Sequence, residues 1–216
     1  MSATNRGAVR VEGDFYGTPG WCTDAILPHI PLAGLVVDAG AGEGQIASRL
    51  VQWGVAPDRI VAVEADPTRA ATCRAACPDV RVLEGDYLDD EVTAPIGNAA
   101  TVIGNPPYDV QGVPGCTAFA FVRKSLALVG ERGTVCMLLR LNWLEGAQVG
   151  EPARLELLQA RMPDVYVLTR RPQFGLNQHG KKGGDACAYA WMVWGPGRIG
   201  RVQMLHVPNG RRRAAA

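Results

Sequence analysis

The chain has 216 residues and nearly balanced charge, with 22 lysines and arginines against 21 aspartates and glutamates. This length suits one folded domain with a sizeable core, and a net charge of +1 means that any basic surface must be local. The six cysteines form no Cys-x-x-Cys pair and the three histidines are scattered, so we expect no metal site. The first 13 residues are polar and no apolar run approaches membrane-spanning length, which predicts a cytoplasmic protein without a membrane partner.

Apolar runs and amphipathic segments alternate along the chain. We expect a flexible N-terminus over residues 1–13, a single domain over 14–209 and a flexible basic tail over 210–216. Helices are predicted over residues 21–30, 45–53, 67–77, 117–129 and 152–161, and strands over 35–37, 60–63, 80–83, 99–103, 133–139, 165–169 and 188–194, with an extra edge strand over 201–207. This alternation is typical of an α/β, Rossmann-like sheet of seven mostly parallel strands. No helix separates the sixth and seventh strands, so the last strand is expected to be antiparallel, in a hairpin with a long basic loop.

A glycine-rich turn follows the first predicted strand. Asp38 ends that strand, and Gly40 and Gly42 belong to a Gly-x-Gly-x-Gly sequence that leads into a helix. Glycines let the backbone bend sharply and approach a ligand. A carboxylate directly before the turn would repel a pyrophosphate but attract an ammonium group. The turn therefore favours S-adenosylmethionine, which has an ammonium group and no phosphate, over NAD; a purely structural turn capped by Asp38 is the alternative.

Acidic residues also end the next two predicted strands. Glu64 ends the second, where a carboxylate can bind both hydroxyls of a ribose. Asp86 and Tyr87 follow the third, placed for the edge and the face of an adenine. Taken alone, Glu64 could be a solvated charge and Asp86 an ordinary loop residue. Their coincidence at three successive strand ends favours a cofactor site.

The fourth predicted strand leads into Asn105-Pro106-Pro107-Tyr108. Each proline fixes its own φ and holds the preceding residue in an extended conformation, so the loop is stiff. It offers a side-chain amide oxygen, a flat ring, and a backbone carbonyl that is followed by a proline, so no N–H of the next residue competes with it. This set suits a planar group bearing an NH2, and a rigid connector is the alternative reading.

Four segments resemble parts of known methyltransferases. Residues 36–44 resemble the first motif of class I S-adenosylmethionine-dependent methyltransferases, and residues 105–108 resemble the (Asn/Asp/Ser)-Pro-Pro-(Tyr/Phe/Trp) signature of methylases that act on planar nitrogens. Residues 15–19 resemble the Phe-x-x-Thr-Pro element of amino-type DNA methyltransferases, and their position upstream is similar to that in gamma-type adenine-N6 enzymes. The segment 171–194 looks like that of the short methylases of phages and prophages.

The resemblance implies methyl transfer from S-adenosylmethionine to the exocyclic N6 amino group of adenine in DNA. The two N–H groups of the amine would donate to the Asn105 side-chain oxygen and the Pro106 carbonyl, and Tyr108 would stack on a flipped base. The implied site comprises catalytic Asn105, Pro106, Pro107 and Tyr108, cofactor-binding Phe15 and Thr18 beside the acidic strand ends, and substrate-binding Phe174. Phe174 has a packed loop aromatic as its alternative reading.

Other substrates stay open from the sequence. The same fold could methylate an RNA adenine, or a protein glutamine, because release-factor methylases share the Asn-Pro-Pro-Tyr signature. A non-catalytic nucleic-acid-binding module is a further alternative. Basic residues at 170–171, 181–182, 198, 201 and 211–213 are either a phosphate track or solvated loop charges. Gamma enzymes usually carry a target-recognition domain, and the short segment after Trp194 predicts short, loop-based or absent sequence discrimination.

Overall fold

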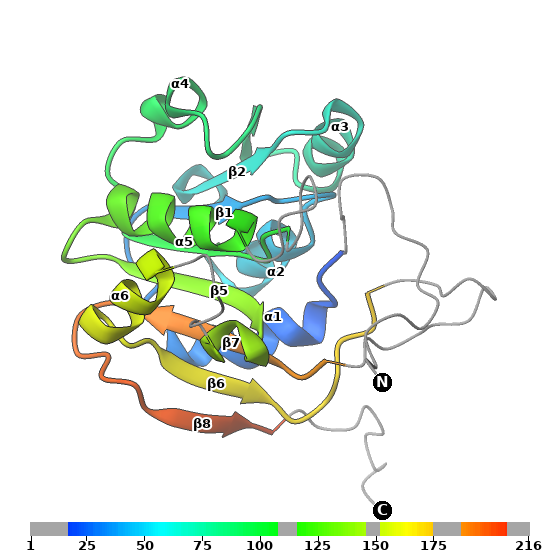
Figure 1. Cartoon of the computed structure of the whole chain (residues 1–216). Coiled ribbons are helices and arrows are strands. Elements are labelled where there is room, and N and C mark those ends of the chain that lie inside the picture. The colour runs from blue at the N-terminus through cyan, green and yellow to red at the C-terminus, as the bar shows by residue number, and fades with distance from the viewer. Residues whose placement is uncertain (1–16, 108–115, 146–151, 175–186, 207–216) are drawn as a thin grey trace, which may run out of the picture.

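The computed structural model describes residues 17–107, 116–145, 152–174 and 187–206, and an eight-stranded sheet forms its centre (Figure 1). The strand order is β3-β2-β1-β4-β5-β7-β6-β8. The strands are β1 (Val36–Ala39), β2 (Ile60–Glu64), β3 (Arg81–Glu84), β4 (Thr101–Gly104), β5 (Thr134–Arg140), β6 (Asp164–Leu168), β7 (Tyr189–Trp194) and β8 (Val202–Leu205). The first five strands are parallel, β7 runs antiparallel to both β5 and β6, and β8 is parallel to β6.

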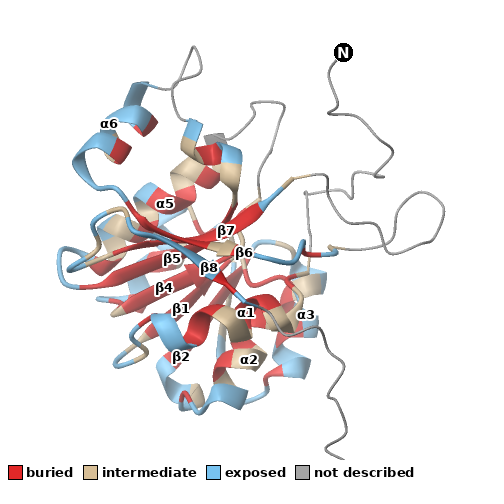
Figure 2. Ribbon diagram, turned by 90° about the horizontal axis from the view of Figure 1, so that it is seen from below, coloured by how far each residue is buried: buried red, intermediate tan, exposed pale blue. Residues whose placement is uncertain are grey.

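Helices cover both faces of this sheet. Figure 2 shows α1, α2 and α3 on one face, and α5 and α6 on the other. The helices are α1 (Gly20–Ile26), α2 (Gln45–Trp53), α3 (Pro67–Ala76), α4 (Asp90–Thr93), α5 (Cys116–Val129) and α6 (Pro152–Ala160), with short 3-10 turns η1 (Leu27–His29), η2 (Pro57–Arg59), η3 (Ala94–Ile96) and η4 (Leu141–Glu145). Within the described ranges, no helix is both long and apolar enough to cross a membrane.

Local sequence explains where the helices that flank the site begin and end. Asp66 is the N-cap of α3: its carboxylate accepts a hydrogen bond from the backbone N–H of Arg69 at 2.8 Å, and Pro67 occupies the first helical position. Helix α2 begins after Gly44 and ends before Gly54, which have φ angles of 86° and 103°. Because this left-handed region favours glycine, both ends of α2 are set by sequence.

The predicted fold class is confirmed, with one difference in the sheet and one among the helices. The alternating segments form a mostly parallel α/β sheet with an antiparallel β7, as expected. The optional edge strand exists as β8, so the sheet has eight strands instead of seven. Helix α4 was not predicted, although Asp89 caps it through a hydrogen bond from the backbone N–H of Glu91 at 2.9 Å.

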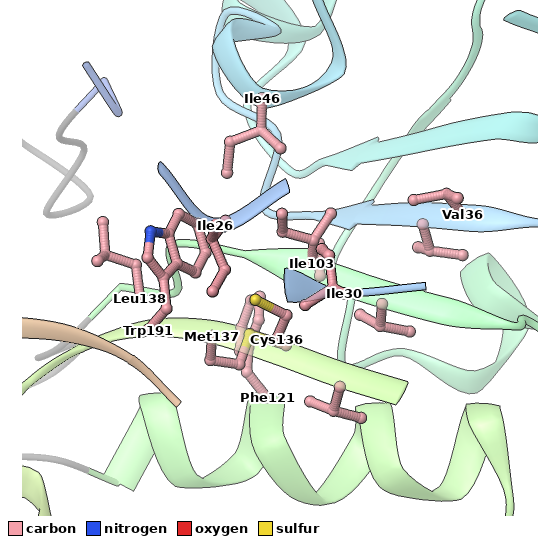
Figure 3. Close-up of a cluster of buried hydrophobic side chains, with 14 of the residues drawn as sticks. Ile26, Ile30, Val36, Ile46, Ile103, Phe121, Cys136, Met137, Leu138 and Trp191 are labelled. Carbon is pink, nitrogen blue, oxygen red and sulfur yellow. The ribbon is translucent and has the colours of Figure 1, made fainter. Parts of the chain in front are cut away.

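Strand β7 is buried along its whole length, because it lies between β5 and β6 in the sheet and helices cover both faces of the sheet (Figure 2). Its Trp191 donates a hydrogen bond from Nε1 to the carbonyl of Cys22 in α1 at 2.9 Å. Figure 3 shows Trp191 near Ile26 of α1, with Phe121 of α5 on the other side of the strands. This bond satisfies a buried indole N–H and attaches α1 to the centre of the sheet.

Helix α1 has two further attachments, both at its surface. Arg49 of α2 donates from Nε to Asp24 at 2.7 Å and forms an ion pair with the same carboxylate. The guanidinium of Arg170, just after β6, lies 5.1 Å from the centre of the Trp21 ring, which is a cation–π distance. Helix α1 is therefore connected to α2 on one side and to the end of β6 on the other.

Two buried threonines differ in whether their hydroxyl has a partner, and this difference predicts opposite effects on stability. Thr23 has a fully buried Oγ1 without a hydrogen-bond partner, whereas Thr101 donates to the carbonyl of Pro31 at 2.8 Å. We expect Thr23→Val to raise the free energy of unfolding by about 1 kcal/mol, because it removes an unpaired buried hydroxyl at nearly constant shape. Thr101→Val should lower it by about 1 kcal/mol. Urea unfolding of both variants checks this, and equal signs would contradict it.

Candidate active site

The glycine turn and the Asn-Pro-Pro loop leave adjacent strands at the same level. Strands β1 and β4 are paired so that Asp38 faces Ile103 and Ala39 faces Gly104. A Cβ atom at Gly104 would lie 2.5 Å from the carbonyl oxygen of Ala39. Only glycine therefore fits there without a backbone shift, and the loop that begins at Asn105 lies directly beside the turn that begins at Gly40.

The backbone amides of the glycine turn are already used within the protein. The N–H groups of Gly40 and Ala41 both donate to the carbonyl of Val63, at 3.0 and 2.9 Å. The N–H of Gly42 donates to Glu64 Oε2 at 2.8 Å. A turn that binds a pyrophosphate instead directs such amides at the phosphate oxygens. The predicted preference against a dinucleotide is consistent with this arrangement.

Asp38 is fully buried behind the turn. Its Oδ2 accepts a hydrogen bond from the backbone N–H of Ala47 in α2 at 3.0 Å, while its Oδ1 has no hydrogen-bond partner. Burial raises the pKa of Asp38 from 3.8 to about 7; the Ala47 bond opposes this rise, and the charge of Glu64 adds to it. A buried oxygen without a partner is costly, so the site favours a ligand that brings a positive charge or a donor.

Glu64 ends β2 as predicted, and its carboxylate holds the surrounding loops together. Oε1 accepts bonds from the Asp66 backbone N–H and from Arg69 Nε, each at 3.0 Å, and Oε2 accepts the Gly42 N–H. A carboxylate has about four acceptor positions, so these bonds fill three of them. A ribose with two hydroxyls would need one bond to be exchanged, and the long side chain of Arg69 is the partner that can move. Arg69 was not singled out from the sequence. Its position in the first turn of α3, shortly after Glu64, is the signal that could have identified it.

Asp86 and Tyr87 follow β3 as expected, but their side chains lie in different surroundings. Asp86 is exposed, and its Oδ1 accepts the backbone N–H of Leu88 at 2.9 Å. Tyr87 is only 2% exposed; its hydroxyl lies 2.8 Å from Ser125 Oγ and its ring centre 5.0 Å from that of Phe121. Burial raises the pKa of Tyr87 to about 12, opposed by the Ser125 bond. The Tyr87 ring packs against α5, and its contact with the face of an adenine stays a prediction.

Asn105 lies where the sequence placed it, directly after β4, and it is half-buried. Its Nδ2 donates to Thr18 Oγ1 at 3.1 Å, across 87 positions of sequence. Thr18 is only 5% exposed, and its hydroxyl contacts Asn105. The cofactor contact that the sequence suggests for Thr18 stays a prediction. Pro106 is buried and Pro107 half-buried. The predicted Phe15 and Tyr108 lie outside the described residues.

Phe174 packs on the sheet. It is half-buried, and its ring is edge-to-face with Tyr189 at the start of β7, with ring centres 5.0 Å apart. The Tyr189 hydroxyl accepts a hydrogen bond from Arg140 Nε, the last residue of β5, at 3.2 Å. In the structure Phe174 is a loop aromatic that packs on Tyr189, and its contact with a substrate base stays a prediction. Arg140 was not singled out from the sequence.

Metal-ligating side chains do not cluster in the part of the chain that the structure describes. There, no group of three or more His, Cys, Asp or Glu side chains is arranged to hold a metal ion. Cys22, Cys73, Cys77 and Cys136 are buried and Cys187 is partly exposed, all as free thiols.

Comparison with solved structures identifies the fold. The DrdV–DNA complex matches with a TM-score of 0.63 at 13% identity, over 85% of this chain and 26% of that one. The methyltransferase subunit of a type I restriction-modification system from Streptococcus thermophilus matches with a TM-score of 0.62 at 18% identity, over 88% and 46%. A Listeria monocytogenes protein, provisionally assigned to the class I S-adenosylmethionine-dependent methyltransferases, matches with a TM-score of 0.60 at 8% identity, over 88% and 64%.

The chain therefore has the Rossmann-like fold of class I methyltransferases, and it spans less than two thirds of the length of each of these three proteins. No protein-family model matches the sequence, and no curated protein matches it.

The raised pKa of Asp38 predicts a pH-dependent contribution to stability. Between pH 3.8 and about 7 the folded protein binds the Asp38 proton and the unfolded chain does not, so the contribution of Asp38 to the free energy of unfolding falls as pH rises. Asp38→Asn can keep the bond from Ala47 but has no charge to bury. We expect this variant to gain stability relative to wild type as pH rises from about 4 to about 8. Urea unfolding at several pH values checks this; a pH-independent difference would contradict it.

Proposed function

We propose that this protein is an S-adenosylmethionine-dependent methyltransferase that methylates the N6 amino group of adenine in DNA. The observation that carries the proposal is the placement of Asn105 and Pro106 directly beside the Asp38–Gly42 turn on adjacent, in-register strands. The fold that the chain shares with class I methyltransferases supports it. The DNA-bound neighbour and the restriction-modification subunit support a nucleic acid as the substrate.

The chemistry of the donor set fits this cofactor. Asp38 has a buried oxygen without a partner, which suits the ammonium group of the methionine part. Glu64 stands at the end of the next strand, where its carboxylate can accept from ribose hydroxyls. Asp86 is exposed at the third strand end and available to the edge of the adenine. The glycine-turn amides point at protein acceptors, which disfavours a dinucleotide.

The loop after β4 supplies the means to activate a planar amine. When bound, S-adenosylmethionine supplies an electrophilic methyl group on a sulfonium. An adenine NH2 is a poor nucleophile because its lone pair is delocalised into the ring. The Asn105 oxygen and the Pro106 carbonyl can each accept one of its N–H bonds, which draws the nitrogen towards sp3 geometry and frees the lone pair. Methyl transfer would form the N–C bond as the C–S bond breaks, with S-adenosylhomocysteine as the leaving group, and the proton of the transiently cationic nitrogen would then pass to solvent.

Charge along the carboxyl edge of the sheet favours a nucleic acid over a protein glutamine. The cofactor half carries acidic strand ends, at Asp38, Glu64 and Glu84. The other half carries Arg140 at the end of β5, and Arg170 and Arg171 just after β6. A phosphate backbone is attracted to such arginines, whereas a glutamine side chain is neutral and gains no comparable attraction from them. An RNA adenine would be served by the same charges and is the second candidate.

Methyl transfer with a tritiated donor tests the proposal directly. The full chain is incubated in parallel with unmethylated duplex DNA, total RNA and a release factor, and labelled nucleosides are identified after digestion. We expect label in N6-methyladenine of DNA. Asn105→Ala should reduce turnover at least about 100-fold and keep the affinity for S-adenosylhomocysteine near that of wild type, because it removes an acceptor that acts on the amine. Label on protein alone would refute the proposal, and label on RNA alone would reassign the substrate.

The arginines near β6 predict a measurable salt dependence. Arg170 is exposed, is held against the Trp21 ring, and forms no ion pair within the described residues. We expect Arg170→Ala to weaken duplex DNA binding and to make the slope of log K against log salt shallower by about 1, the loss of one phosphate contact. Arg161, an exposed arginine before β6 at the opposite edge of the sheet, is the matched control. Fluorescence anisotropy at several salt concentrations measures both; an equal loss in Arg161→Ala would contradict a specific contact.

A further inference from the structure

We propose that Thr18 is a positioning residue that orients the side-chain amide of Asn105 for methyl transfer, in place of a contact to the cofactor. The inference rests on the proposed function, because it assigns Thr18 a role in the same reaction. Its basis is the hydrogen bond from Asn105 Nδ2 to Thr18 Oγ1 at 3.1 Å, which joins two segments that are 87 residues apart in sequence.

In the structure the bond holds the Nδ2 end of the amide against Thr18, so Oδ1 faces away from that residue. An amide carries a donor and an acceptor on the same planar group, and only the acceptor can take an N–H from an adenine amine. A hydroxyl that accepts from Nδ2 fixes this end of the group and directs Oδ1 away from Thr18. Without the hydroxyl the amide loses this anchor, and fewer molecules hold Oδ1 in the position that accepts from the amine.

Thr18 is held well enough to act in this way. It is only 5% exposed and lies two residues before α1. That helix is attached to β7 through the Trp191–Cys22 bond and to α2 through the Arg49–Asp24 pair. Because α2 follows the glycine turn, the threonine is fixed by elements from both the cofactor half and the substrate half of the sheet edge.

The size of the effect follows from the energy of one hydrogen bond. A hydrogen bond between neutral groups contributes about 0.5–1.5 kcal/mol, which is roughly a 2- to 12-fold change in an equilibrium between the anchored and the released amide. A positioning role affects only the fraction of molecules with the productive orientation. It therefore lowers kcat and leaves cofactor affinity unchanged, whereas loss of a direct cofactor contact would weaken cofactor binding.

The test uses Thr18→Val, which removes the hydroxyl at nearly constant shape, and Thr18→Ser, which keeps it. We expect Thr18→Val to lower kcat about 2- to 12-fold, with the Kd for S-adenosylhomocysteine by calorimetry and the KM for the donor unchanged, and Thr18→Ser to restore kcat. In the Asn105→Ala background, Thr18→Val should have no further effect on residual turnover, because its action passes through the amide. The side-chain NH2 resonances of Asn105 in a 15N NMR spectrum should shift in Thr18→Val and not in Thr18→Ser.

Thr23→Val is the matched control, since it is the same substitution at a buried threonine five residues later whose hydroxyl has no partner. It should leave kcat and Kd at wild-type values. Weaker S-adenosylhomocysteine binding in Thr18→Val would overturn the inference in favour of a cofactor contact. An unchanged kcat, unmoved Asn105 resonances or an additive double variant would also overturn it. Absence of methyl transfer by the wild-type chain on every substrate would instead refute the proposed function, and the NMR and calorimetric results would tell the two failures apart.

Discussion

The approach of Gly104 to the carbonyl of Ala39 fixes the geometry on which the rest of the site depends. Strands β1 and β4 come together because position 104 has no side chain, and their register sets the glycine turn level with the Asn-Pro-Pro loop. A larger residue would push apart the two segments that must meet if a donor on one is to react with an amine on the other. The proximity of the two halves is thus a property of the sheet, and the loops need only elaborate it.

The edge of the sheet divides into two halves with different charge and different hydrogen-bond supply. After β1, the N–H groups of the glycine turn donate within the protein, the carboxylate of Glu64 accepts from this turn, and the carboxylate of Asp38 accepts from α2. Beyond β4 the strand ends carry arginines and aromatic rings. The first half is suited to a ligand with a positive charge and hydroxyls, the second to a ligand with negative charge and flat bases.

Much of this could be predicted from sequence because it depends on local patterns. The alternating apolar runs, the Asp66-Pro67 cap and the glycine turn identify the elements and the strand-end positions of Asp38, Glu64 and Asn105. What could not be predicted depends on contacts between distant segments. The Tyr87 ring is turned inward by a helix that begins some thirty residues later, and Thr18 meets a loop 87 residues away. Likewise, β7 enters the sheet between two earlier strands through pairing that no local pattern specifies.

The buried state of Asp38 has a consequence for proton balance. With a pKa of about 7, this carboxyl is roughly half protonated near neutrality when nothing lies beside its free oxygen. An ammonium group placed there stabilises the carboxylate and lowers that pKa, so the bound proton must be released to solvent. On the proposed function, uptake of the cofactor is then an exchange of one cation for another. Such an exchange becomes more favourable as pH rises through 7, until the ligand's own amine begins to lose its proton near pH 8, the ordinary range of an α-amino group.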